Sequence, residues 1–110
     1  MKYLAECIGT YFLVSVVIGS GIMAESLSNG NVAVALLGNT LATGAILFVL
    51  IKMFGPISGA HFNPAVSLVF YIRKELEQKD FAIYVLAQVV GGLIGVFLTH
   101  YIFNIQILQV

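Results

Sequence analysis

Charged side chains are scarce in this sequence. Only 9% of its 110 residues are Asp, Glu, Lys or Arg, whereas a soluble globular domain carries about 25%. Hydrophobic residues make up 60% of the chain, which is more apolar surface than a water-soluble core can absorb. The five basic and five acidic residues give a net charge of zero, and nothing suggests the clustered basic face that a nucleic-acid partner needs. The composition therefore indicates an integral membrane protein with no nucleic-acid partner.

Reactive side chains are equally scarce. Cys7 is the single cysteine, which excludes an internal disulfide and a cysteine metal cluster, and we expect it to pack inside an apolar run. Outside the apolar runs there is no nucleophile–base pair, carboxylate dyad or phosphate-binding loop, so we expect no enzyme. His61 lacks the partner pattern of a metal site. The sequence predicts neither a metal ion nor a cofactor.

Three apolar runs are long enough to cross a bilayer. A hydrocarbon core of ~30 Å needs about 20 helical residues, and the runs that meet this length are Tyr3 to Met23, Val32 to Phe54 and Phe81 to Phe103. The first run exceeds the apolar core of about 7–15 residues in a signal peptide, so we expect a span rather than a cleaved leader. We predict a single all-α membrane unit over residues 1–110.

The basic residues predict the orientation of the three spans. All five precede the first span, end the second or precede the third: Lys2, Lys52, Arg73, Lys74 and Lys79. Because Lys and Arg concentrate on the cytoplasmic side, we expect a cytoplasmic N-terminus and an outside C-terminus in the plasma or inner membrane.

The segment from residue 55 to residue 72, between the second and third spans, is too apolar at its start to be an ordinary loop. Pro56 and its neighbouring glycines predict that the second helix stops at Gly55. Asn63 followed by Pro64 predicts a new helix, because Asn is a favoured N-cap and Pro a favoured first residue. That helix of about nine residues covers only ~13 Å, and an extended segment before it could reach ~26 Å. We therefore predict a loop that dives to the membrane midplane and a half-helix that returns to the same side.

Backbone outside a helix is tolerated at membrane depth only where it is buried in protein or lines a water-filled cavity. The free carbonyls of Ser58 to Phe62 would then offer acceptors to a solute, while the half-helix N-terminus would repel cations. The amide NH2 of Asn63 would be a donor. The alternative from spacing alone is a cap that merely begins an interfacial helix on a cytoplasmic loop.

The string SGAHFNPAVSL, from Ser58 to Leu68, resembles the first Asn-Pro-Ala loop of the major intrinsic protein family, the aquaporins and glycerol facilitators. The similarity extends to the first span at Ala5, Glu6, Gly9 and Thr10, and to the third span at Ala87, Gln88 and Gly91. It implies one repeat of the inverted-repeat fold of that family: three spans plus one re-entrant half-helix.

The resemblance also implies roles for individual residues. It places Asn63, with Pro64 and Ala65, at the pore centre as a donor to the solute, and the carbonyls of Gly59, Ala60 and His61 along the inner half of the pore. We expect His61 to contribute its backbone rather than its ring. Glu6 resembles the buried acid that braces the loop. Its alternative is a side chain that snorkels to the inner surface.

The size filter of the family takes a side chain, usually aromatic, twenty residues before the motif asparagine, and that position is Thr43 here. Threonine would leave a wider and more polar opening, so glycerol-like solutes or metalloid acids become candidates besides water. The alternative is that Thr43 only bonds the backbone of its own helix.

Small residues and tyrosines complete the pattern. Gly91 and Gly95 lie four residues apart and predict close helix packing. Tyr3, Tyr84 and Tyr101 lie near span ends, where interfacial aromatic residues are expected.

The sequence contains one such repeat, and one repeat cannot enclose a pore. We expect a second half of opposite orientation, with higher homo-oligomers of the completed channel in the lipid bilayer. An antiparallel homodimer is disfavoured by the one-sided charges. A truncated, non-conducting fragment is the alternative. A small multidrug-type transporter, suggested by the early Glu6, is a further alternative, but such transporters have four spans and no Asn-Pro loop.

Overall fold

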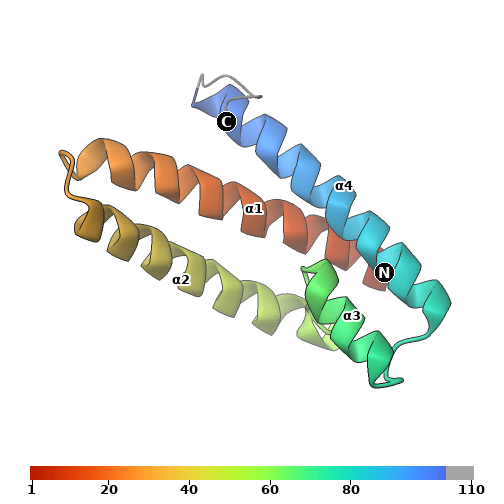
Figure 1. The fold of residues 1–110 in the computed structure, drawn as a ribbon. Helices are drawn as coiled ribbons and strands as arrows, with labels where there is room; N and C mark the ends of the chain where they lie inside the picture. The colour runs from red at the N-terminus through yellow and green to blue at the C-terminus, as the bar shows by residue number, and fades with distance from the viewer. Residues whose placement is uncertain (104–110) are drawn as a thin grey trace.

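The computed structural model describes residues 1–103, which form four helices (Figure 1). They are α1 (Lys2–Leu27), α2 (Val32–Ser58), α3 (Pro64–Ile72) and α4 (Gln78–Ile102). Helices α1 and α2 form an antiparallel hairpin, and α4 packs on α1 along another side. The short α3 lies at the end of the molecule that also holds the N-terminus, the end of α2 and the start of α4. The predicted outward C-terminus falls on residues 104–110, outside the described part.

The predicted stop of the second helix at Gly55 is wrong. Helix α2 continues through Pro56 to Ser58 and ends at Gly59, which adopts the left-handed conformation with φ 87°. The amide of Gly59 donates to the carbonyl of Gly55 at 2.9 Å, which is the usual way a glycine closes a helix. One proline removes a single helical hydrogen bond, and membrane helices tolerate it. The segment between α2 and α3 is consequently only residues 59–63.

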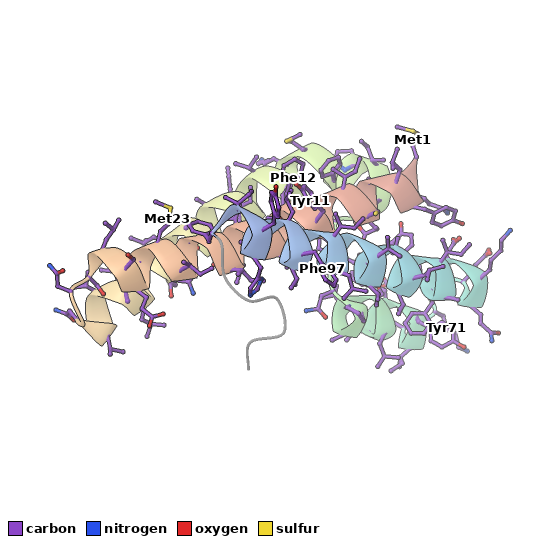
Figure 2. The ribbon with its side chains drawn as sticks, turned by 90° about the horizontal axis from the view of Figure 1, so that it is seen from above. Met1, Tyr11, Phe12, Met23, Tyr71 and Phe97 are labelled. Atoms are coloured by element: carbon purple, nitrogen blue, oxygen red, sulfur yellow. The ribbon has the colours of Figure 1, made fainter. Side chains whose placement is uncertain are left out.

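Three of the four helices have the length and hydropathy of membrane spans, and α3 at nine residues does not. The distribution of side chains agrees with a lipid environment. The largest fully buried side chains are polar, namely Gln88, Glu6 and Ser67. Large apolar side chains point outward instead (Figure 2), and Phe12 and Phe97 are about half exposed. This is the reverse of a soluble fold, in which apolar groups fill the interior.

The glycine pair of the third span lies in the contact between α1 and α4. A Cβ on Gly91 would come within 2.1 Å of the Cys7 carbonyl oxygen, and one on Gly95 within 2.8 Å of the Tyr11 carbonyl oxygen. The two backbones therefore approach more closely than any larger residue would allow. Small residues give membrane helices this kind of contact, because dispersion forces and not water exclusion hold them together.

Candidate pore-lining site

Helix α3 begins at the Asn-Pro pair, as the sequence predicts. Asn63 has extended backbone angles, and its Oδ1 accepts a hydrogen bond from the amide of Ala65 at 2.8 Å. Pro64 is the first residue of the helix. Because capping uses the side-chain oxygen, the NH2 group of Asn63 remains as a donor on an exposed side chain.

The Asn-Pro corner lies level with the middle of the long helices. Asn63 and Pro64 line a groove of about 400 Å³ whose other walls come from α1 and α4, including Thr10, Val14, Val89, Leu93 and Val96. These residues occupy the central turns of helices that run from 2 to 27 and from 78 to 102. A nine-residue helix that starts at this depth spans ~13 Å, so it returns only to one end of the bundle.

The carboxylate of Glu6 holds the segment before Asn63. Its Oε2 accepts from Ser58 Oγ at 2.7 Å and from the His61 amide at 3.1 Å. Its Oε1 accepts from the Phe62 amide at 2.9 Å and from Gln88 Nε2 at 2.8 Å. The residue is completely buried, so the alternative of a snorkelling side chain is wrong. One carboxylate thus connects α1 to the end of α2, to the loop and to α4.

The loop needs this support because its backbone is strained. Ala60 and Phe62 both have φ 54°, a left-handed conformation that costs a residue other than glycine about 1–3 kcal/mol. The two amides fixed by Glu6 belong to His61 and Phe62, and the Phe62 ring fills the space over Gly9.

The ring of His61 also makes contacts within the bundle, whereas from the sequence we expected a role only for its backbone. Its Nδ1 lies 2.9 Å from Ser67 Oγ, and the ring stacks on Phe70 at a centroid distance of 4.6 Å. Ser67 is completely buried and also accepts from Gln88 Nε2 at 3.0 Å. The His61 ring therefore links the loop to α3, and Gln88 links α3 to α4.

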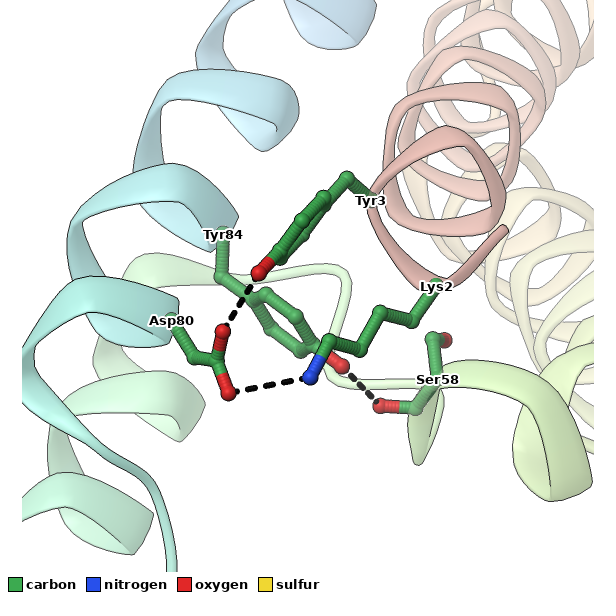
Figure 3. Close-up of polar contacts among 5 residues, drawn as sticks. All are labelled: Lys2, Tyr3, Ser58, Asp80 and Tyr84. Atoms are coloured by element: carbon green, nitrogen blue, oxygen red, sulfur yellow. Dashed lines mark hydrogen bonds and ion pairs between the residues drawn. The ribbon is translucent and has the colours of Figure 1, made fainter.

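A second group of polar contacts joins the starts of α1 and α4 to each other and α4 to the end of α2 (Figure 3). Tyr84 is buried, and its hydroxyl donates to the Ser58 carbonyl at 2.7 Å, so its prediction as an interfacial tyrosine is wrong. Asp80 accepts from Tyr3 at 2.5 Å and pairs with Lys2 at 3.0 Å. The starts of α1 and α4 are joined at the same end as the close of α2.

Not every expected residue reaches this site. Thr43 lies half-buried in the middle of α2 and is not among the residues that line the groove at Asn63. From the sequence we assigned no role to the hydroxyls of Ser58, Ser67 and Tyr84. The expectation that the Ser58 carbonyl is free is wrong, because Ser58 ends α2 and its carbonyl accepts from the Tyr84 hydroxyl. Gln88 entered only through the family resemblance, although a polar amide inside an apolar span is itself a signal of function.

The geometry can be compared with known proteins. A family profile described as "Major intrinsic protein" matches residues 1–109, almost the whole chain. The chain belongs to the major intrinsic protein family. The buried Glu6, the Asn63–Pro64 corner and α3 all lie within the matched residues.

Relatives within the family are similar over nearly all of this chain. "Aquaglyceroporin AqpS" of Rhizobium meliloti (strain 1021) is 53% identical over 104 residues, covering 94% of this chain and 44% of the relative. "Aquaporin Z" of Rhodopseudomonas palustris is 37% identical over 101 residues, covering 92% and 41%. "Aquaporin NIP1-1" of Arabidopsis thaliana is 36% identical over 105 residues, covering 96% and 34%. The chain spans less than half the length of these relatives.

Proposed function

We propose that this chain is one half of a passive channel for water and small uncharged solutes, completed by a second half of opposite orientation. The observation that supports it best is the Asn63 amide, held at mid-depth with its oxygen engaged and its NH2 group available. A water or solute oxygen can accept a hydrogen bond from this group, and the next molecule can take its place without any covalent bond being made or broken. The positive end of α3 beside it disfavours cations.

The proposed membrane orientation follows from the distribution of charge. Lys2 and Lys79 lie at the end of the molecule where α1 and α4 begin, and Arg73 and Lys74 follow α3 at that end. The loop between α1 and α2, at the opposite end, carries no basic residue. On the positive-inside rule the N-terminus is cytoplasmic, in the plasma or inner membrane. The completed channel would associate further into homo-oligomers.

The proposed solutes include molecules larger than water. Thr43 occupies the position at which the family usually has an aromatic filter residue, and a threonine there leaves a wider and more polar passage. Glycerol-like molecules and metalloid acids are the candidates. The name of the 53% identical relative, an aquaglyceroporin, is in line with this choice.

The test is permeability of liposomes that contain the chain together with the second half of the Rhizobium meliloti relative. Asn63→Asp keeps an N-cap oxygen but removes the NH2 donor, and we expect water and glycerol permeability to fall about two- to tenfold, the effect of one hydrogen bond of ~0.5–1.5 kcal/mol. The matched control is Asn31→Asp, because Asn31 caps α2 through its side chain in the same way but lies in the loop at the other end. Permeability no higher than that of empty liposomes would favour a non-conducting fragment.

A further inference from the structure

A second groove opens between α1 and α2 at the end of the molecule away from Asn63. Its volume is about 400 Å³. Glu25, Ser28 and Asn39 supply polar groups to its wall, and Val32, Ala35 and Leu36 supply apolar ones. Grooves of this size are typical of small-molecule sites, in which a few polar groups orient a ligand against an apolar wall.

Asn39 is the polar residue of α2 that lines this groove farthest from the start of the helix, and a hydrogen bond fixes the orientation of its side-chain amide. Ser20 Oγ on α1 donates to Asn39 Oδ1 at 2.8 Å. The amide lies over Gly21, where an added Cβ would be 3.6 Å from Oδ1. Among residues 1–103 the NH2 group of Asn39 has no hydrogen-bond partner. Asn39 is half-buried, and its NH2 group is not among the buried atoms that lack a partner, so this donor is accessible from the groove.

The helical register places Asn39 on the same face of α2 as Thr43, one turn nearer the start of the helix. Val32, Leu36 and Asn39 line the groove and recur every three or four residues, so they share one face of α2, and Thr43 is one turn further along that face. A solute that follows this face from the outer end meets Asn39 before it meets Thr43.

We infer that Asn39 is a specificity-determining residue, whose NH2 group donates to a hydroxyl oxygen of small neutral polyols of the glycerol class. The inference rests on the proposed channel function and deepens it. A polyol has a hydroxyl edge and a C–H edge. Asn39 matches the hydroxyl edge, the apolar side chains of the groove match the C–H edge, and the Glu25 carboxylate, which also lines the groove, can accept a hydrogen bond from a further hydroxyl. Water has no C–H edge and gains much less from this groove.

The experiment compares glycerol and water permeability of the same reconstituted complex. Asn39→Leu keeps the approximate volume of the side chain and removes its donors, and we expect the ratio of glycerol to water permeability to fall about two- to tenfold. Ser20→Ala is a gentler change that releases the amide, and it should lower the same ratio by less. The matched control is Thr40→Val, since Thr40 is exposed and lies one residue along on another face; its ratio should not change.

The outcomes separate this inference from the function on which it rests. An unchanged ratio in both Asn39→Leu and Ser20→Ala, with a permeability that still falls in Asn63→Asp, would overturn the role of Asn39 and leave the channel proposal standing. The same unchanged ratio would be the result if the second half or a lipid covered the groove. Absence of any conduction above empty liposomes would overturn both proposals together.

Discussion

Replacement of Glu6 by glutamine is the sharpest test of how the loop before Asn63 is held. The Glu6 carboxylate accepts all four of its hydrogen bonds, and each of its two oxygens accepts one of them from a backbone amide. A glutamine keeps one oxygen and replaces the other with NH2. In either orientation of the amide, this NH2 group faces a backbone N–H, from His61 or from Phe62, which cannot accept a hydrogen bond.

The cost can be worked from this geometry. A buried donor left without a partner destabilises a protein by about 1–3 kcal/mol, so Glu6→Gln should lower the free energy of unfolding by ~1–3 kcal/mol. If the loop opens locally, the same energy raises the open population about 5- to 150-fold. Exchange of the His61 and Phe62 amide hydrogens should accelerate by that factor, because these amides bond to Glu6.

The assay is amide hydrogen exchange together with denaturant unfolding of the chain in lipid nanodiscs. Glu77→Gln is the matched control, since Glu77 is an exposed glutamate and its side chain makes no capping bond to α4. We expect the control to change the unfolding free energy by less than ~0.5 kcal/mol. Exchange at His61 and Phe62 that is no faster in Glu6→Gln than in the control would refute the bracing role of Glu6.

Two further predictions concern helix packing and the size of the passage. Gly91→Ala should destabilise the fold by ~1–3 kcal/mol in the denaturant titration, because its Cβ would meet the rigid Cys7 carbonyl. Gly92→Ala is the control: the nearest neighbours of its Cβ are side chains at 3.7 and 3.8 Å, so it should be neutral or slightly stabilising. Equal effects of the two variants would contradict this account. Thr43→Phe in the reconstituted complex should lower glycerol permeability on the order of tenfold while water permeability falls less, and an unchanged ratio of the two would remove Thr43 from the filter.

The polar contacts of the loop also explain how the start of α3 is held at mid-depth in the bundle. Ser67 and His61 connect the loop to α3, and Gln88 of α4 donates to Ser67 on α3 and to Glu6 on α1. These groups satisfy one another inside the bundle, where no water is available to replace a lost bond. The contacts that support the Asn63 corner are therefore complete within this chain, apart from the buried oxygen of Gln88, which has no partner among the described residues.

The sequence by itself determined the membrane class, the three spans and the start of α3 at Asn63-Pro64. These features depend on local properties: the hydropathy of about 20 consecutive residues, and the chemistry of one cap and one proline. It misjudged the end of α2, since whether Gly55 or Gly59 takes the left-handed conformation depends on where the loop is anchored. The loop is anchored by Glu6, a residue far away in the sequence, so its anchoring is a tertiary contact.

The family resemblance indicated Glu6 as a brace of the loop, but only the tertiary structure decided which groups Glu6 binds and which other side chains hold the loop. Glu6 meets Ser58 and Gln88 across separations of 52 and 82 residues, and no spacing in the sequence indicates such a meeting. Tyr84 shows the same limit: its position near a span end predicts an interfacial ring, but the packing of α4 against the end of α2 buries its hydroxyl on the Ser58 carbonyl. Local chemistry fixed where α3 begins, and the satisfaction of buried polar groups fixed where α2 ends and what the loop between them is bound to.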